Sequence, residues 1–225
     1  SSNYTIFIIF NSNTFKVILL NIFRIMKLIS VSNLVSFVIK TCTKLNIDES
    51  HALKHSMDVF YNSHSIFENE QNKYTFNDNE LIRCKNIMNT CSILHDMCDN
   101  KYINEEVGWN FIYEFLKPQM DTHDIDISKK IIMTMSYSKV KKNGYPDVFT
   151  NPNDLFIYHI VREGDLLASY DFERCMIYGI YKRDLEYDEC FQEAQKLFES
   201  RMFQYINMDL FVHEYSKSQA EILHK

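Results

Sequence analysis

Glycine and proline are scarce in this chain, which contains only four glycines and three prolines among 225 residues. Glycine supplies the positive φ angles of tight turns, and proline presets many others, so turn-rich all-β folds normally use both often. Their scarcity therefore disfavours such folds. It favours long helices joined by short connections.

Length and charge set the next limits. A chain of 225 residues with 46% hydrophobic and 24% charged residues is ordinary for a globular protein of one large or two small domains. No internal repeat or linker is visible, so we predict one domain over residues 26–225. The formal charge of −6 gives no overall attraction to nucleic acid or to an anionic membrane. A phosphate-bearing ligand would need local cations or a metal ion.

Residues 1–25 differ from the rest of the chain. Two apolar runs, TIFIIF and FKVILLNIF, are separated by the polar residues 11–14. A membrane-spanning helix needs about 20 mostly apolar residues, and a signal peptide ends at a small-residue cleavage site. Neither pattern is complete, so we interpret residues 1–25 as a leader or disordered extension, with membrane anchoring as the weaker alternative. Met26 begins a stretch, MKLISVSNLVSF, that is typical of the start of a domain.

The six cysteines indicate the redox compartment. None forms a CxxC pair, and their spacing resembles neither a disulfide framework nor a zinc module. Cys84, Cys91 and Cys98 are seven residues apart, on one helical stripe, and cysteine is usually buried. We therefore expect buried free thiols and a reducing, intracellular location in the cytoplasm.

Apolar spacing and capping residues predict the helices. The predicted caps are residues 48–50 for the second helix, Asn77 or Asp78 for the third, and Asn153 or Asp154 for the helix that ends at Leu167; Pro118 ends the fourth. The predicted helices cover residues 31–45, about 50–68, 78 to the His95-Asp96 pair, 105–116, 125–140, 153–167 and 170–183, with one or two more between 187 and 225.

The stretch Leu81–Asp99 carries the strongest chemical signal, the adjacent pair His95-Asp96. Adjacent side chains on a helix lie about 100° apart, so an imidazole and a carboxylate can bind one divalent ion from neighbouring corners. An apolar run, CSIL, precedes the pair. His55 and Asp165 lie in two other helical patterns, LKHSMDVF and VREGDLLASYD.

Together, His55, His95-Asp96 and Asp165 resemble the H…HD…D signature of the HD-domain metal-dependent phosphohydrolase superfamily. The segments KHSMDV, ILHDMCD and REGDLL are similar to the family's metal-binding helices, and the match covers roughly residues 31–181. The resemblance implies an all-α, single-domain helical bundle with its metal site between three helices. It also implies hydrolysis of phosphate esters, and the 5'-nucleotidase-like branch is favoured.

The resemblance implies that one divalent ion is bound by His55, His95, Asp96 and Asp165. This mixed nitrogen and oxygen set suits Mn, Fe, Co, Zn or Mg better than a thiolate-selective metal. Such a site can bind water and a phosphate oxygen at its open positions. Asp96 is therefore counted among the catalytic residues as well.

Asp99 is the predicted acid or base. It lies three residues after Asp96, near the same face of a helix. Nucleotidases of the superfamily often carry a glutamate at this position, and the resemblance implies a similar role in proton transfer for Asp99. A carboxylate beside an activated water suits general acid–base catalysis.

Substrate contacts are predicted from basic residues near these positions. Arg162 precedes Asp165 by nearly one helical turn and is the main candidate for binding phosphate, with Lys141, Lys142 and Lys139 as further candidates. His51 lies one turn before His55 and is expected at the rim of the site.

A second metal ion is not expected. The segment YSKVKKNGYP resembles the HHE…GYP segment of the cyclic-di-GMP phosphodiesterase branch. Ser136, Tyr137 and Ser138 stand where that branch has the histidines for its second ion. The chain also lacks a phosphate-binding glycine loop, a GxSxG elbow and an HExxH motif.

The predicted function is metal-dependent hydrolysis of a small phosphorylated nucleotide, and a nucleoside monophosphate is the favoured substrate. One alternative is a phosphodiesterase or pyrophosphohydrolase acting on cyclic or polyphosphorylated nucleotides. Another is a non-catalytic HD scaffold that binds a nucleotide. Nucleic acid is not expected as a partner, because no surface stripe of basic and aromatic residues is visible. An oligomer is compatible with the sequence.

Overall fold

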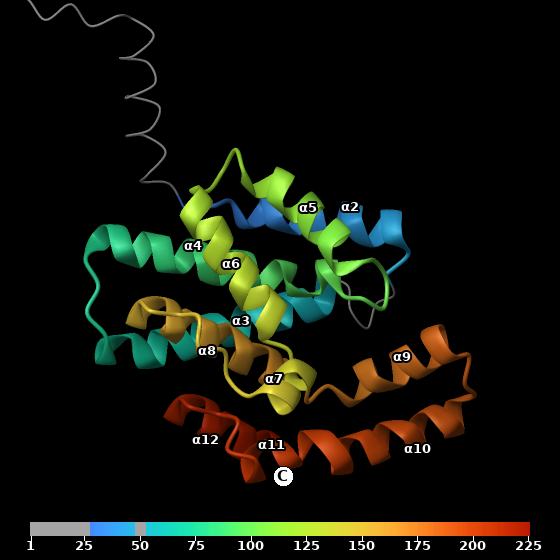
Figure 1. The fold of residues 1–225 in the computed structure, drawn as a ribbon. Coiled ribbons are helices and arrows are strands. Elements are labelled where there is room, and N and C mark those ends of the chain that lie inside the picture. The colour runs from blue at the N-terminus through green and yellow to red at the C-terminus, as the bar shows by residue number, and fades with distance from the viewer. Residues whose placement is uncertain (1–27, 48–52) are drawn as a thin grey trace, which may run out of the picture.

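The structure, a computed structural model, describes residues 28–47 and 53–225. These residues form helices and no β-strand, which confirms the predicted all-α fold (Figure 1). In these two ranges no helix is both long and apolar enough to cross a membrane. The predicted extension (residues 1–25), the predicted cap (residues 48–50) and His51 lie outside the described residues.

Two predicted helices, residues 31–45 and 105–116, are confirmed at both ends. The α-helices are α2 (Val31–Leu45), α3 (Leu53–Glu70), α4 (Asp78–Leu94), α5 (Glu105–Leu116), α6 (Thr122–Thr134), α7 (Tyr137–Asn143), α8 (Pro152–Ala168), α9 (Phe172–Arg183), α10 (Tyr187–Leu197), α11 (Gln204–Asn207) and α12 (Glu214–Leu223). Shorter turns are the 3₁₀ helices η1 (Gln71–Lys73) and η2 (His95–Cys98) and the π-helical turn η3 (Phe198–Met202).

Capping residues explain where α4 and α8 begin. Asn77 caps α4 through a capping box with Glu80, in which each side chain accepts a hydrogen bond from the other's backbone N–H. The prediction of Asn77 or Asp78 is thus confirmed. For α8 the predicted cap, Asn153 or Asp154, is wrong: Asn151 is the cap. Pro152 then occupies the first helical turn, where its missing N–H costs nothing.

The predicted helix over residues 125–140 is wrong as a single element. The chain leaves the helix after Thr134, and Ser136 has extended backbone angles (φ −61°, ψ 145°) before α7 starts. Serine is a favoured residue at such helix starts, but no glycine or proline marks the break. The resulting bend brings the first turn of α7, including Lys139, to the wall of a cavity.

The close pair α3 and α8 is central to the fold, and α4 packs against both helices. Gly164 permits this approach: a Cβ atom there would lie 2.5 Å from the Ser63 hydroxyl and 3.1 Å from the Val59 carbonyl oxygen. A larger residue would push the two backbones apart. The next residue, Asp165, is thereby brought toward the start of α3.

The predicted stripe of buried free thiols is confirmed. Cys84, Cys91 and Cys98 are all buried, and none of the six cysteines is in a disulfide. Cys98 also contacts α5, because Gly108 lies so close that a Cβ there would be 2.7 Å from the Cys98 Cβ. The thiols therefore serve as small apolar core residues, and Cys98 lies in the same 3₁₀ turn as the His95-Asp96 pair.

Helices α9 and α10 form a hairpin that extends to one side of the molecule (Figure 1). They pack mainly against each other, and Gly179 allows this because a Cβ there would lie 2.9 Å from Cys190 Sγ. The chain then returns through η3 and α11 to α12, which packs on α8 and α3. The hairpin thus adds a wall beside the helical body without entering its core.

Candidate metal centre

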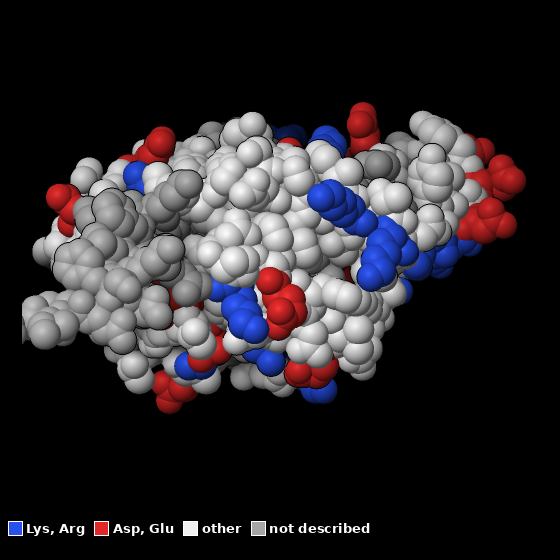
Figure 2. Space-filling model, turned by 90° about the horizontal axis from the view of Figure 1, so that it is seen from above, with Lys and Arg blue, Asp and Glu red and all other residues white. Residues whose placement is uncertain are grey.

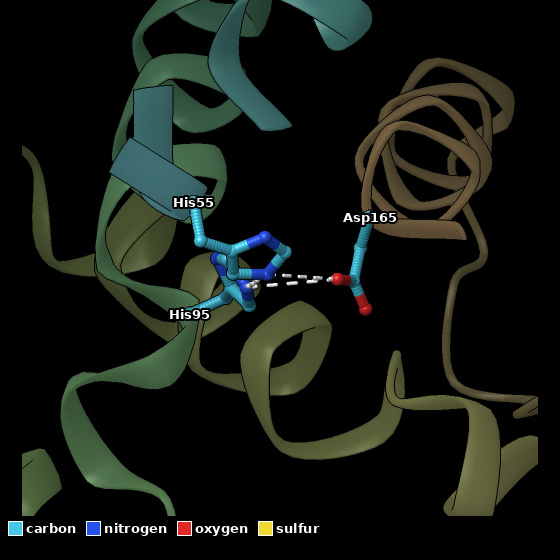
Figure 3. A group of neighbouring side chains, drawn as sticks. All are labelled: His55, His95 and Asp165. Atoms are coloured by element: carbon cyan, nitrogen blue, oxygen red, sulfur yellow. Dashed lines mark hydrogen bonds and ion pairs between the residues drawn. The ribbon is translucent and has the colours of Figure 1, made fainter. Parts of the chain in front are cut away.

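Three side chains from different helices converge at one point (Figure 3). His55 lies in the first turn of α3, His95 directly follows α4, and Asp165 lies near the end of α8. His55 Nε2 is 3.2 Å from both Asp165 Oδ1 and His95 Nε2, and His95 Nε2 is 3.8 Å from Asp165 Oδ1. One donor atom from each residue lies within 4.8 Å of the others, so the three could hold a metal ion together.

Asp96, the fourth predicted ligand, flanks this group. Its Oδ1 is 3.5 Å from His95 Nε2, and its Oδ2 is 3.7 Å from His55 Nε2. Its Oδ2 also lies 3.7 Å from a terminal nitrogen of Arg174 on α9. The pair His95-Asp96 belongs to a 3₁₀ turn, not to the α-helix that the sequence predicted, because α4 ends at Leu94.

The backbone fixes the orientation of the His95 ring. His95 Nδ1 is 2.9 Å from the Ser92 carbonyl oxygen. A carbonyl oxygen can only accept, so Nδ1 carries the proton and the Nε2 lone pair faces His55 and Asp165. Metal-binding histidines are commonly oriented in this way by a backbone carbonyl.

Burial and charge keep the group in a form that suits a cation. Burial and the positive charge of Arg174 lower the pKa of His55, so its ring is held neutral. Burial opposes ionisation of Asp165, but the hydrogen bond from His55 and nearby positive charge hold the pKa of its carboxyl below its ordinary range. Imidazole nitrogens beside an ionised carboxylate suit Mn, Fe, Co, Zn or, with more oxygen ligands, Mg. The residues present therefore fit a divalent ion.

A cavity of about 600 Å³ opens beside the group. Its walls are η2 and the loop after it, the bend between α6 and α7, and the α9–α10 hairpin with η3. His95, Asp96 and Asp165 line it, while His55 is buried behind them. Small-molecule sites have volumes of roughly 300–1,000 Å³, so the open side of this group of side chains faces a space of suitable size.

The cavity is highly charged but balanced. It is lined by five cationic side chains and five carboxylates. The cations are Lys101, Lys139, Arg174, Arg183 and Arg201, and the carboxylates are Asp96, Asp99, Glu105, Asp165 and Glu193. Apart from its histidine, the lining carries no net formal charge before an ion binds. The outer surface differs: on the face seen from above, acidic and basic residues are interspersed with broad uncharged areas (Figure 2).

Asp99 lines the cavity together with Asp96. The sequence predicted Asp99 on the same helix as Asp96. This is wrong, because η2 ends at Cys98 and Asp99 has extended backbone angles. Asp99 Oδ1 accepts a hydrogen bond of 2.9 Å from the Lys101 backbone N–H, and its Oδ2 lies 3.5 Å from Lys101 Nζ. The carboxylate is thus held at the cavity wall by the following loop.

The phosphate-binding prediction for Arg162 must be corrected. Its side chain is 1% exposed and does not line the cavity. Its guanidinium lies 3.1 Å from Glu163 Oε1 and 3.3 Å from His159 Nδ1, and packs 4.9 Å from the centre of the Tyr145 ring. Although Arg162 lies one turn before Asp165, its long side chain enters a separate buried ion pair.

The predicted lysines divide into two groups. Lys141 and Lys142 are exposed and do not line the cavity, which corrects their assignment as substrate contacts. Lys139 does line it and forms an ion pair with Glu105. His51 lies outside the described residues.

Two cavity residues, Arg174 and Arg201, are absent from the sequence-based assignments. Arg174 follows Asp165 by nine residues across the break between α8 and α9, so helical spacing could not relate the two. Arg201 lies in η3, 36 residues after Asp165, and belongs to no motif. Only the three-dimensional return of the chain brings them to the site.

No protein-family model, curated protein or solved structure matches this chain.

Proposed function

We propose that this chain is a metal-dependent phosphohydrolase that acts on a small nucleotide, most favourably a nucleoside monophosphate. The observation that carries the proposal is the convergence of His55, His95 and Asp165 beside a cavity lined by both cationic and acidic side chains. The sequence resemblance to the HD superfamily supports the same assignment.

The contacts within the group support a metal role over a structural one. His55 Nε2 and His95 Nε2 face each other at 3.2 Å, and the Ser92 carbonyl already fixes the proton of His95 on Nδ1. Without a metal ion, the two facing Nε2 atoms share at most one proton, which can form a hydrogen bond in only one direction at a time. A cation would satisfy both lone pairs and the Asp165 carboxylate together.

The chain's own residues have separate roles. Bound here, a divalent ion would supply positive charge to the phosphoryl group and lower the pKa of a water. Asp99, on the same cavity wall, is placed to accept or return a proton. Arg174 orients Asp96, because its guanidinium lies 3.7 Å from Asp96 Oδ2.

Charge and polarity of the cavity support the substrate class. Since cations and carboxylates balance in its lining, a divalent ion would leave two positive charges, which match a phosphate monoester dianion. Apolar side chains line the remaining surface, among them Ile132, Met135 and Leu197. Such a surface favours a substrate with an organic group, as in a nucleotide, over inorganic phosphate alone.

A metal analysis joined to a phosphate-release screen tests the proposal. We expect close to one divalent ion per wild-type chain purified without chelator, and release of phosphate from nucleoside monophosphates with at least one of Mn, Co, Mg and Zn. His95→Ala should lose both properties, while His123→Ala, at an exposed histidine, should keep them. A wild-type chain that binds no metal would refute the proposal.

The screen also separates the alternatives. Release of phosphate only from cyclic or polyphosphorylated nucleotides would assign a phosphodiesterase or pyrophosphohydrolase. Stoichiometric metal and tight nucleotide binding without turnover would assign a binding scaffold.

A further inference from the structure

Arg201 differs from the other cations of the cavity in its partners. The other four lie within 4.0 Å of a carboxylate that also lines the cavity: Lys101 with Asp99, Lys139 with Glu105, Arg174 with Asp96, and Arg183 with Glu193. Among the described residues, no carboxylate lies this close to Arg201. Its positive charge is therefore available to an anion in the cavity.

The guanidinium of Arg201 is nevertheless held in a fixed place. Its Nε donates a hydrogen bond of 2.9 Å to the Tyr205 hydroxyl, and its Cζ lies 4.5 Å from the centre of the Tyr137 ring. These contacts use Nε and one flat face of the group. The terminal nitrogens Nη1 and Nη2 make no hydrogen bond within the described part of the chain, so they can form a two-pronged contact with phosphate.

The anchor of Arg201 leads back to the metal group. The Tyr205 hydroxyl accepts a hydrogen bond of 3.2 Å from Ser169 Oγ. Ser169 lies one turn after Asp165, and its backbone N–H donates to the Asp165 carbonyl oxygen at 3.0 Å. Arg201, Ser169 and Asp165 all line the same cavity. The C-terminal turn η3 is thus fixed to the helical turn that presents a metal ligand.

We infer that Arg201 is the residue that binds the substrate's phosphate group, through Nη1 and Nη2, while the opposite side of the phosphate faces the metal centre. This inference rests on the proposed function. It gives the C-terminal segment a role in substrate recognition, because Arg201, Tyr205 and the ring of Tyr137 build the phosphate site together.

Binding of inorganic phosphate to the full chain tests this inference. Isothermal titration calorimetry would be run with and without Mn²⁺ for the wild type, Arg201→Gln, Arg201→Lys and Arg183→Gln. Arg183→Gln is the matched control: it removes the same charge from the same cavity, but from a cation already paired at 2.8 Å with Glu193. Circular dichroism and metal content would be measured on every variant.

We expect Arg201→Gln to weaken phosphate binding roughly ten- to hundredfold, the usual effect of losing hydrogen bonds to a charged group. Arg201→Lys should recover only part of this affinity, because an ammonium keeps the charge without the planar fork. Arg183→Gln should bind phosphate within about threefold of wild type. Helicity and metal content should stay unchanged in all variants.

The outcomes separate this inference from the proposed function. Wild-type phosphate affinity in Arg201→Gln, or an equal loss in Arg183→Gln, would overturn the role of Arg201 even if metal binds. Absence of phosphate binding by the wild type would overturn it too. Phosphate binding that depends on Arg201 in a chain that binds no metal would support Arg201 while refuting the metal-dependent function.

Discussion

Helix α8 carries two charged clusters, one on each side of Gly164; Glu163 of the first is fully buried, and Asp165 of the second is partly exposed. The first contains Arg162 and Glu163, and the second contains Asp165 with its histidines. Glu163 accepts hydrogen bonds from the backbone N–H groups of Val212 (2.7 Å) and His213 (3.3 Å), from His213 Nδ1 (3.0 Å) and from Arg162 (3.1 Å). Asp165 instead faces two imidazole nitrogens and the cavity.

This difference is our reason for proposing a structural role for the first cluster and a metal-binding role for the second. In the Glu163 cluster, the protein's own donors satisfy a fully buried carboxylate and fasten the segment before α12 to α8. In the Asp165 cluster, two imidazole nitrogens and a carboxylate face one another beside an open cavity, where one cation could bind all three together. Charged side chains are at least partly buried in both clusters, so access to the cavity and the balance of hydrogen-bond donors and acceptors distinguish the two.

The largest expected effect comes from Asp165→Asn. The amide removes one charged ligand, so metal affinity should fall at least a hundredfold, more than the 10–100-fold loss for a residue that only orients a ligand. The fold should be retained, because asparagine has nearly the same shape as aspartate and can still accept a hydrogen bond from His55. Metal titration and thermal unfolding measure the two effects. Unchanged metal affinity would show that Asp165 is not a metal ligand and would remove the proposed difference between the two clusters.

Glu163→Gln should have the opposite profile. It leaves the buried Arg162 without its counter-charge, and breaking a buried pair costs about 3–5 kcal/mol of unfolding free energy. Metal binding should survive in the folded fraction. Urea denaturation gives the free energy, with Glu68→Gln, at an exposed position of α3, as the control expected to show no change. A stable Glu163→Gln that has lost its metal would reverse the two assignments.

The Glu163 cluster also predicts a pH dependence of stability. Burial and the neighbouring Arg162 lower the pKa of His159 to about 4, below its ordinary value of 6.5. Between these pH values only the unfolded state binds the proton, so stability is complete above pH 6.5 and falls as the pH drops toward 4, by up to about 3 kcal/mol. Urea unfolding at several pH values measures the slope, which His159→Gln should reduce. An unreduced slope would assign it to other groups.

Gly164→Ala should affect both clusters through their shared backbone. The new methyl group would meet the Ser63 hydroxyl and the Val59 carbonyl oxygen, and such overpacking typically costs about 1–3 kcal/mol. It should also weaken metal binding, because α8 would move away from α3 and from His55. Denaturation and metal titration test this, with Gly144→Ala as a control in open space that tests only its positive φ of 74°. A fully stable variant with unchanged metal affinity would show that the close helix contact does not hold the site.

The fold was largely predictable because its local signals are strong. The start of α5 follows Asn104, whose side chain caps the backbone N–H groups of Glu106 and Val107, and apolar spacing then gives its length. The bend at Ser136 escaped prediction because neither glycine nor proline marks it. Helix ends without such markers depend on tertiary packing, which a single sequence does not contain.

The site was predictable in part. The resemblance selected His55, His95, Asp96 and Asp165; the structure brings the two histidines and Asp165 together, with Asp96 beside them, and Asp99 and Lys139 line the cavity. Arg162 was misassigned because helical spacing gives only the direction of its Cα–Cβ bond and not the end point of its long side chain. That end point is set by Glu163, which is itself held by His213, 50 residues further along the chain. Arg201 escaped prediction because its place depends on how the chain returns after the α9–α10 hairpin.

The central claim is that His55, His95 and Asp165 hold a divalent ion, and anomalous diffraction from crystals grown with Mn²⁺ tests it most directly. We predict one strong anomalous peak at bonding distance, about 2.0–2.3 Å, from His55 Nε2, His95 Nε2 and an Asp165 carboxylate oxygen. The open side of the ion should face the cavity lined by Arg201. A crystal with no peak among these three side chains, or with Mn²⁺ bound only elsewhere, would contradict the account.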